Sequence, residues 1–382
     1  MSVLGAGKAV LRGIYGLHKK AATRPDRVAI ISRQSNAPSI DIRLLRAALE
    51  KNGDVDVRVL CKTLDGGILR KIGYLFHMIG PQMHAIATSK VVVLDSYCIA
   101  VSILEHKKDL TVIQMWHAMG ALKKFGKSIL GQAEGSSRAL AEEMQMHRGY
   151  DVLLASSEAS LPFFAEAFGY EENRFWILPL PRTDLLRDKA YMEARREEIL
   201  KANPQLAGRK ILLYAPTMRK TGEDLTKPVE LAREVQKYGE YLLVVSPHPV
   251  TGMQEGAYLK QLKENGAQFL PDCSTLDLLS VCDVFISDYS AAVFEAAAAG
   301  KPVCLYAYDL DKYLKTRGFY LDYEKEMPGI PYRTAEEVMR AVADGVPDPA
   351  QAERFAARYI APVEHTAEEL ASRIRALLRE RK

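Results

Sequence analysis

The sequence predicts an α/β protein of two domains, each built around a parallel β-sheet. Its 382 residues suit two or three domains of ordinary size. Short β-branched apolar runs alternate with amphipathic stretches along most of the chain. A proline-rich break, LPLPRTD at 178–184, falls near the middle. Such alternation is typical of parallel sheets covered by helices on both faces. We therefore expect two domains of this kind, joined at the break.

The first domain, 28–182, is expected to contain five strands. They are the apolar runs at 28–32, 55–60, 91–94, 112–115 and 152–155. Helical periodicity falls between or after them, at 137–146 and 158–168. Continuous apolar runs of this length favour strands buried on both faces.

The second domain, 183–346, follows the same plan. Its strands are expected at 210–214, 241–246, 283–287 and 302–306, and its helices at 184–201 and 291–299. The tail, 347–382, reads as two helices rich in Ala, Arg and Glu that brace the first domain. The two domains are expected to face a cleft with the carboxyl ends of their strands, where ligands bind on the loops.

Composition excludes several classes of protein. Hydrophobic residues make up 48% and charged residues 26%, which excludes a disordered chain, a collagen and a membrane bundle. The net charge of +4 is too mild to indicate nucleic-acid binding, so no nucleic acid is expected as a partner. The five cysteines are odd in number and form no CxxC pair, which favours reduced thiols in the cytosol. No transmembrane segment or signal peptide is expected.

The N-terminal segment, 1–27, carries the basic excess, with six basic residues and one acidic residue. Val3, Val10 and Leu17 recur every seven residues among its lysines and arginines. A basic amphipathic helix is typical of a membrane-surface element that binds anionic lipid. The stretch 67–79 is a second candidate for membrane contact. For both segments the alternative is an ordinary core helix.

The first chemical motif follows the strand at 112–115. His117 comes just after it, following Trp116, and a histidine at a strand end can act as a general base. Lys123 and Lys124 lie a few residues further on and can hold a phosphate of the acceptor. The alternative is a surface histidine beside a solvated basic turn.

Further motifs follow the strands of the second domain. His248 lies in SPHP after the strand at 241–246, and its flanking prolines suit either a rigid ligand-holding group or a plain turn. Thr217 and Arg219 supply a hydroxyl and a cation after the strand at 210–214.

A polar turn separates the strand at 283–287 from a helix of small residues. Ser287, Asp288 and Ser290 occupy this turn, and backbone amides with serine hydroxyls can bind an anion there. An ordinary N-cap is the alternative, and both can hold at once. Asp309 and Asp311 form a DxD pattern, but no other carboxylate cluster accompanies it, so no metal site is expected.

These stretches together resemble the CDP-glycerol glycerophosphotransferase family, the teichoic acid primases and polymerases. The resemblance is carried by QMWHAMGALKKFG, LPLPRTDLL, LLYAPTMRK, SPHP and ISDYSAAVFEAAAAGKPVCLYAYDLDKYLKTRGFYLDY, in the order of the family, from Gln114 to Tyr323. It implies two Rossmann-like domains in the GT-B arrangement. It also implies transfer of glycerol phosphate from CDP-glycerol, or ribitol phosphate from CDP-ribitol, to a lipid-linked acceptor at the cytoplasmic face of the membrane, with no cofactor.

The resemblance also assigns roles to residues. His117 and His248 match two histidines essential in the family, with His117 the better placed as base, although the roles can be reversed. Ser287, Asp288 and Ser290 match the turn that meets the phosphates of the donor, and Thr217 and Arg219 lie in the donor-side loop.

One departure from the family pattern leaves alternatives open. Many members read WHGT where this chain has Ala118 and Met119 after the histidine, which removes a hydroxyl and puts the alditol in doubt. The alternatives to a glycerol-phosphate transferase are a ribitol-phosphate transferase, a GT-B nucleotide-sugar glycosyltransferase, and a catalytically silent membrane-associated nucleotide-binding protein.

Overall fold

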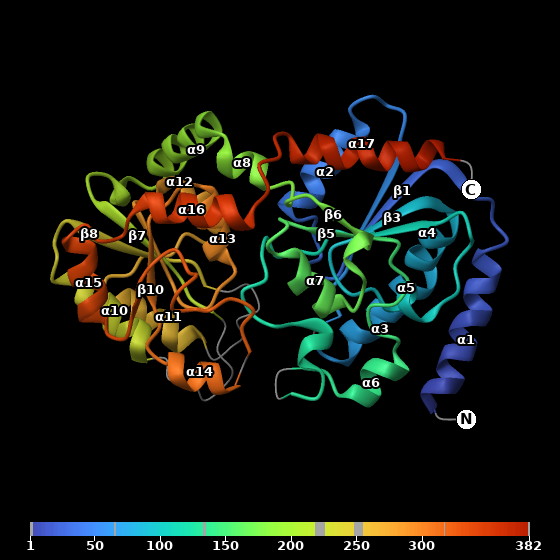
Figure 1. Cartoon of the computed structure of the whole chain (residues 1–382), viewed down its shortest axis with the longest axis horizontal. Helices are drawn as coiled ribbons and strands as arrows, with labels where there is room; N and C mark the ends of the chain where they lie inside the picture. Colours follow the sequence, from blue (N-terminus) through green and yellow to red (C-terminus); the bar gives the residue numbers. More distant parts are fainter. Residues whose placement is uncertain are drawn as a thin grey trace. The chain divides into compact units, whose positions relative to one another are not determined.

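The computed structural model divides the chain into two compact units (Figure 1). It describes residues 3–64, 66–132, 135–217, 226–247, 255–316 and 318–380. The first unit comprises Met1–Ala118, Phe125–Asp184 and Val363–Lys382, and the second comprises Met119–Lys124 and Leu185–Pro362. The chain therefore enters the second unit twice, first for only six residues.

The first unit is built on a six-stranded parallel sheet in the order β2-β1-β3-β4-β5-β6. Its strands are β1 (Arg24–Ser32), β2 (Asp56–Cys61), β3 (Ser89–Leu94), β4 (Thr111–Gln114), β5 (Val152–Ala155) and β6 (Phe175–Ile177). The five strands expected from the sequence are present. The short β6 was not predicted, because three residues carry no periodic pattern. Every residue of β3 is buried, as expected of a central strand covered on both faces.

Helices follow most strands of this sheet. They are α1 (Val3–His18), α2 (Ile40–Glu50), α3 (Ile68–His77), α4 (Met83–Thr88), α5 (Ile99–Ile103), α6 (Arg138–Glu143), α7 (Leu161–Phe168) and α17 (Thr366–Arg379). A π-helical turn, η1 (Met78–Gln82), joins α3 to α4 and contains Pro81. Since proline cannot donate a backbone hydrogen bond, this turn is where the α-helical pattern is interrupted.

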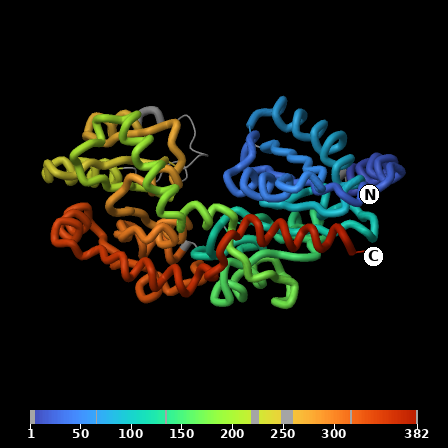
Figure 2. The backbone as a smooth tube through the Cα atoms, turned by 90° about the horizontal axis from the view of Figure 1, so that it is seen from above, coloured from blue at the N-terminus to red at the C-terminus, as the bar shows by residue number. Residues whose placement is uncertain are grey.

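The C-terminal helix α17 packs on the first unit, against α2, β1 and β3 (Figures 1 and 2). Leu370 and Ile374 of α17 are fully buried in the same core as Leu45 of α2. Asp184 holds the start of the helix, because its carboxylate accepts hydrogen bonds from the Thr366 and Ala367 amides at 2.7 and 3.0 Å. The other C-terminal helix, α16 (Pro349–Tyr359), instead packs on α13 (Ala292–Ala298) of the second unit.

The second unit has a five-stranded parallel sheet in the order β11-β10-β9-β7-β8. Its strands are β7 (Lys210–Ala215), β8 (Tyr241–Val245), β9 (Val284–Ser287), β10 (Val303–Tyr306) and β11 (Pro331–Tyr332). The four strands expected from the sequence are present, and the two-residue β11 was not predicted. The remaining helices are α8 (Thr183–Arg187), where the chain passes from one unit to the other, and α9 (Lys189–Ala202), α10 (Thr226–Gln236), α11 (Glu255–Glu264), α12 (Thr275–Val281), α14 (Leu310–Thr316) and α15 (Ala335–Ala343).

The six-residue segment 119–124 is part of the second unit because it packs closely there. A Cβ atom at Gly120 would lie 2.2 Å from the Phe294 ring, so only glycine allows this approach. The Lys124 amide donates to the Gly318 carbonyl at 2.9 Å, and the Tyr320 amide donates to the Leu122 carbonyl at 3.0 Å. These bonds join the segment to the chain after α14 by a short antiparallel pairing.

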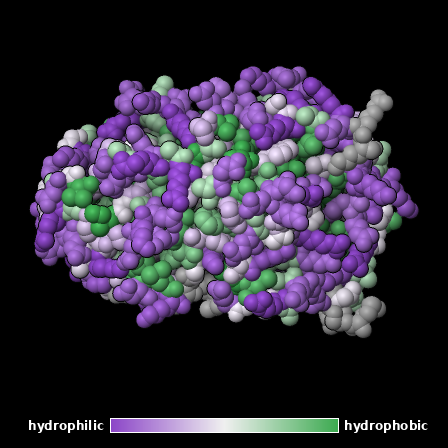
Figure 3. Space-filling view, viewed as in Figure 1, coloured by the Kyte–Doolittle hydropathy of each residue, from purple (hydrophilic) through white to green (hydrophobic). Residues whose placement is uncertain are grey.

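All five cysteines are free thiols in the structure, as the sequence predicts. Among the described residues, no helix is long and apolar enough to cross a membrane. The face seen in Figure 3 is mostly hydrophilic, with smaller hydrophobic patches.

We expect Asp184→Ala to lower the free energy of unfolding by about 1–2 kcal/mol, because α17 loses the carboxylate that caps its first amides. Urea unfolding followed by circular dichroism measures the change. The control is Glu368→Gln, which removes an ion pair between Glu368 and Lys51. The two side chains are 55% and 65% exposed, respectively. Exposed pairs contribute little, so a loss as large in the control would contradict the capping role of Asp184.

Candidate functional site

Each sheet reverses its strand order at one point. Of the predicted site residues, His117 lies near this point in the first sheet, and Thr217, Ser287, Asp288 and Ser290 lie near it in the second. In the first unit the chain leaves β1 toward β2 and later returns to β3 on the other side. In the second unit it leaves β7 toward β8 and returns to β9. The crevice outside the carboxyl ends of strands at such a switch point is the usual ligand site of an open parallel sheet.

His117 lies at the carboxyl edge of the first sheet, three residues after β4. Its Nδ1 atom is 2.8 Å from the backbone carbonyl oxygen of Asp95, which directly follows β3. The Gln34 side-chain amide nitrogen lies 3.2 Å from the same Nδ1. One nitrogen cannot donate to the carbonyl and accept from the amide at once, so the shorter contact sets the tautomer. Nδ1 carries the proton, and Nε2 keeps a lone pair.

Burial keeps the His117 imidazole neutral. It lowers the pKa of His117 to about 4, with a further lowering from the Arg182 guanidinium and a partial opposing effect from the Asp95 carbonyl. No hydrogen-bond partner of Nε2 occurs among the described residues. A neutral imidazole with one free lone pair can accept a proton from a hydroxyl group, which is the chemistry of a general base.

Trp116 directs His117 through an unusual backbone conformation. Its φ of +65° is rare for a bulky residue and costs about 1–3 kcal/mol. The indole packs against the His117 ring, with centroids 4.2 Å apart, and stacks on Phe125 at 5.2 Å. Phe168 meets it edge-on. This aromatic packing offsets the strain and orients the loop that carries the histidine.

A buried ion pair holds the same loop in place. Asp41, in the first turn of α2, is 1% exposed, and its carboxylate is paired with the Arg182 guanidinium. The Arg182 amide also donates to Asp41 at 2.8 Å. The Nη2 atom of Arg182, which is also paired with Asp41, donates to the His117 carbonyl at 3.1 Å. The arginine of the LPLPRTD motif therefore has a positioning role toward the candidate base.

In the second unit, Ser287 and Asp288 have their side chains turned inward. Both are fully buried at the end of β9. The Ser287 hydroxyl donates to the Ala215 carbonyl at 2.7 Å. The Asp288 carboxylate accepts from the Thr217 amide at 2.8 Å and from the Tyr289 amide at 2.6 Å. Their contacts hold the loops after β7 and β9 together at the switch point.

Two hydroxyls at this switch point remain better placed for a ligand. Thr217 is partly exposed as a residue, but its Oγ1 atom is buried and has no hydrogen-bond partner among the described residues. Ser290 is also partly exposed, and its hydroxyl oxygen accepts a hydrogen bond from the Ala292 amide at 3.3 Å. The helix that follows, α13, has only seven residues and begins after Ala291 without a side-chain cap.

Lys123 and Lys124 belong to the second unit, whereas His117 of the same sequence motif belongs to the first. The Lys123 ammonium lies 3.4 Å from the Tyr313 hydroxyl, and the Lys124 ammonium lies 5.6 Å from the centre of the Tyr320 ring. Proximity in sequence therefore does not place them in one unit with the histidine.

Two predicted residues, His248 and Arg219, lie outside the described residues. The aspartates of the DxD pattern have protein partners. Asp309 accepts from the Tyr289 hydroxyl at 2.9 Å, and Asp311 lies 3.7 Å from the Arg333 guanidinium. Within the described part of the chain, no group of three His, Cys, Asp or Glu residues is arranged to hold a metal ion.

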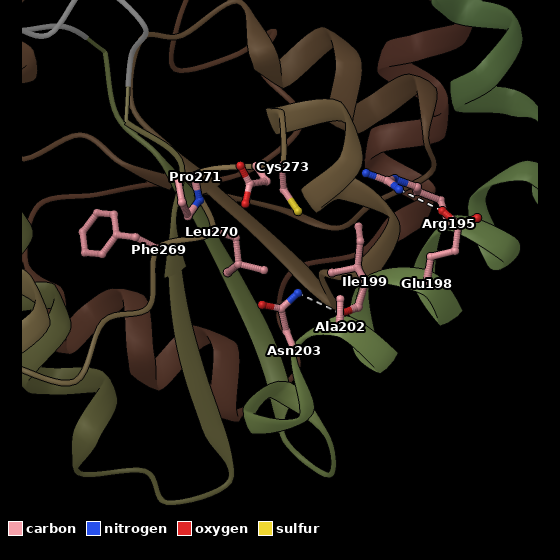
Figure 4. Close-up of a pocket in the computed structure, with 10 residues that line it drawn as sticks. Arg195, Glu198, Ile199, Ala202, Asn203, Phe269, Leu270, Pro271 and Cys273 are labelled. Atoms are coloured by element: carbon pink, nitrogen blue, oxygen red, sulfur yellow. Dashed lines mark hydrogen bonds and ion pairs between the residues drawn. The ribbon is translucent and has the colours of Figure 1, made fainter.

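A pocket of about 280 Å³ lies elsewhere in the second unit, between α9 and the segment before α12 (Figure 4). None of the predicted site residues lines it. Arg195, the cation at its rim, is already paired with Asp277 and Glu198 at 2.8 Å each. We therefore assign no part of the chemistry to this pocket.

The sequence interpretation missed three contributors to the His117 site: Asp95, Asp41 and Arg182. A signal for Asp95 was present, since it is the first polar residue after the apolar run VVVL. The pairing of Asp41 with Arg182 spans 141 residues, and no local pattern could have indicated it.

A family model described as CDP-Glycerol:Poly(glycerophosphate) glycerophosphotransferase matches residues 15–378. Among curated proteins, the chain is 31% identical over 363 residues to the teichoic acid ribitol-phosphate primase of Bacillus spizizenii, covering 92% of each chain. It is 37% identical over 250 residues to the teichoic acid glycerol-phosphate primase of the same organism, covering 64% of this chain and 62% of the relative.

Solved structures agree on the fold. The wall teichoic acid polymerase TagF superposes with a TM-score of 0.76 at 19% identity, covering 96% of this chain and 93% of that chain. The fold is therefore the GT-B-like fold expected from the sequence. A Staphylococcus aureus MnaA–UDP structure superposes less well, with a TM-score of 0.61 at 12% identity, covering 92% of this chain and 97% of that chain.

We expect the His117 imidazole to remain neutral, with its proton on Nδ1, at every pH above about 4. Nitrogen-15 NMR of histidine-labelled protein measures both properties, and the spectrum of His117→Gln assigns the resonance. Its folded-state pKa lies below the ordinary 6.5, so the unfolded chain binds the proton first as the pH falls. The contribution of His117 to stability is thus complete above about 6.5 and is lost toward pH 4. A titration midpoint near 6.5, or a proton on Nε2, would refute the assignment.

Proposed function

The chain belongs to the CDP-glycerol:poly(glycerophosphate) glycerophosphotransferase family, and on that premise we propose that it transfers an alditol phosphate from a CDP-alditol to a lipid-linked acceptor. CMP is the second product, and the process served is the synthesis of teichoic acid or a related cell-surface polymer. The observation that carries the proposal is His117, a neutral imidazole held by a backbone carbonyl with its other nitrogen available.

The proposed reaction is an in-line displacement at phosphorus. A hydroxyl oxygen of the acceptor attacks the β-phosphorus of the donor and forms a new P–O bond. The bond between this phosphorus and the bridging oxygen breaks, and CMP leaves with the electron pair. The acceptor proton passes to Nε2 of His117. Such transfers depend on positioning and on stabilisation of the spreading charge, and we propose that this enzyme needs neither metal nor cofactor.

We assign the acceptor to the first unit and the donor to the second. Thr217 and Ser290 supply the donor phosphates with hydroxyl groups, while Ser287 and Asp288 keep the two loops in place. Arg219 and His248 complete the donor side by their position in the family motifs, and Lys123 and Lys124 remain candidates for a phosphate of the acceptor. His248 is proposed to donate a proton to the phosphate or to the leaving group.

The favoured donor is CDP-ribitol, with CDP-glycerol as the second candidate. Support for ribitol comes from the ribitol-phosphate primase, which aligns over 92% of both chains. Support for glycerol comes from the glycerol-phosphate primase, which is more identical over a shorter span.

We further propose that α3 attaches the enzyme to the anionic cytoplasmic face of the membrane. Ile68, Leu69 and Phe76 are 75%, 81% and 64% exposed, so α3 is not the core helix that the sequence left as an alternative. Arg70 and Lys71 are exposed beside them. Apolar side chains flanked by cations suit the interface of an anionic bilayer.

The helix α1 is a weaker contributor to this attachment. Val10 and Leu17 are 62% and 64% exposed, one heptad apart on the helix. On the inner side, Tyr15 is buried, and its hydroxyl lies 2.8 Å from Nδ1 of His106. The segment is thus anchored to the first unit along one side and presents apolar residues on another.

We expect release of CMP from CDP-ribitol that depends on a lipid-linked acceptor and persists in EDTA. CDP-glycerol and a UDP-sugar are offered in parallel to the same enzyme. His117→Ala should lower kcat by about 10²–10⁴-fold, the usual contribution of a general base. The matched control is His84→Ala, an exposed histidine of α4, which should retain activity.

Each outcome of this assay has a distinct meaning. Turnover of CDP-glycerol alone would reassign the alditol and leave the reaction class intact. Turnover of the UDP-sugar alone would move the enzyme to the nucleotide-sugar transferases. Failure to use either CDP-alditol with a competent acceptor would overturn the proposal and favour a silent nucleotide-binding protein.

We expect the double variant Leu69→Glu with Phe76→Glu to bind vesicles containing phosphatidylglycerol at least about tenfold more weakly, since it removes two exposed apolar side chains and adds negative charge. Co-sedimentation with the vesicles measures the binding. Leu314→Glu is the control, because Leu314 is also an exposed leucine, 47% accessible, but lies on α14 of the second unit. Equal binding by all three proteins would exclude α3 as the attachment surface.

A further inference from the structure

Asp95 occupies the switch point of the first sheet. It directly follows β3, and β3 pairs with β1 up to Ile31 and Leu94. The next step along the two strands brings Ser32, the last residue of β1, beside Asp95. Parallel sheets of this order bind their ligands outside the carboxyl ends of the strands at this point.

The Asp95 carboxylate is buried without a hydrogen-bond partner. The residue is 2% exposed, and neither of its carboxylate oxygens has a described residue in good hydrogen-bond geometry, although the Ser32 and Ser96 hydroxyls lie near enough to favour the ionised form. Asp41, equally buried in the same unit, shows the usual solution, with its carboxylate bonded to the Arg182 guanidinium and amide. A buried carboxylate without such partners is unfavourable. Its presence therefore points to a ligand that supplies the missing hydrogen-bond donors.

The groups around Asp95 come from every strand end near the switch point. Burial raises the pKa of Asp95 to about 6, and the Ser32 and Ser96 hydroxyls act in the opposite direction. Burial raises the pKa of the Cys61 thiol at the end of β2, and the Asp95 charge raises it further. The charged and titratable groups near Asp95 on the neighbouring elements are Arg33, Asp41, Cys61, His117 and Arg182.

Arg33 directly follows β1 at the same switch point. Its backbone amide donates to the Ser96 hydroxyl at 3.0 Å. Its guanidinium lies over the Tyr74 and Tyr97 rings, 5.9 and 5.6 Å from their centres. The Nε atom is buried and has no partner among the described residues. The cation whose charge acts on Asp95 is the Arg182 guanidinium, which is itself paired with Asp41. A buried carboxylate with no well-placed donor suits a ligand that offers hydroxyl groups.

Asp95 is also tied directly to the candidate base. Its backbone carbonyl is the group that fixes the tautomer of His117. A hydroxyl-bearing ligand held by the Asp95 side chain is therefore bound by the same residue that orients the imidazole.

We propose that Asp95 is an acceptor-binding residue whose carboxylate accepts hydrogen bonds from the hydroxyl groups of a polyol phosphate in the acceptor. The attacking hydroxyl is thereby positioned for His117. This inference rests on the proposed function and names the residue that recognises the acceptor within it.

The test is steady-state kinetics of Asp95→Asn with a CDP-alditol and a lipid-linked polyol-phosphate acceptor. We expect KM for the acceptor to rise about 10- to 100-fold, the usual effect of losing hydrogen bonds to a charged group. KM for the donor should change less than about twofold. The thermal midpoint should be equal to that of the wild type or higher, since a buried charge without partners is removed.

The pH profile provides a second readout. With the wild type, kcat/KM for the acceptor should rise as the pH passes through about 6, where Asp95 ionises. His117 is already neutral in this range, so the Asp95→Asn profile should lack this rise.

The matched control is Asp151→Asn. Asp151 directly precedes β5, at the amino ends of the strands and so away from Asp95. Its carboxylate accepts a hydrogen bond from the Val112 amide at 2.8 Å. This variant should keep the acceptor KM of the wild type, even where its thermal midpoint falls.

Several results would overturn the inference. An unchanged acceptor KM in Asp95→Asn would do so, as would parallel rises in both KM values with a lowered thermal midpoint, which is the sign of a structural role. If Asp95→Asn does not fold, Asp95→Ser replaces it, and failure of both to fold would also assign Asp95 to structure. Inactivity of the wild type toward CDP-alditols is a separate result, because it refutes the proposed function itself.

Discussion

The buried ion pair between Asp41 and Arg182 is the interaction on which the first unit's site depends. It joins the start of α2 to the loop after β6, and through the His117 carbonyl it reaches the loop after β4. A buried pair of this kind is stable only when each charge is fully satisfied, and here the Arg182 amide and the His117 carbonyl supply further hydrogen bonds. Three segments far apart in sequence are thereby held in one arrangement.

The same unit contains a second buried carboxylate, Asp95, for which the protein supplies no such partner among the described residues. The contrast is physical, because both groups bear the cost of leaving water and only Asp41 recovers it within the chain. The left-handed backbone of Trp116 is also unfavourable. Both features lower the stability of the folded chain near the switch point of the first sheet. Sites that bind and react commonly show such losses.

The second unit reaches its switch point by a different design. There the conspicuous motif residues Ser287 and Asp288 are used to build the loops, and the less conspicuous Thr217 keeps an unbonded hydroxyl. A motif can therefore be specific to a family because its side chains shape the backbone, and not only because they touch a ligand. A sequence comparison therefore does not distinguish residues that shape the loop from residues that contact the ligand.

The sequence alone determined the two parallel sheets, nine of their strands and the position of His117 after β4, because buried strands and strand-end residues leave local patterns. It did not reveal β6 or β11, which are too short for periodicity. The tertiary structure alone decided that Lys123 belongs to a different unit from His117, and that Arg182 pairs with Asp41. It also decided the protonation of His117, since burial and the distant Asp95 carbonyl together set its pKa and tautomer. These properties depend on contacts between residues separated in sequence, which no local pattern encodes.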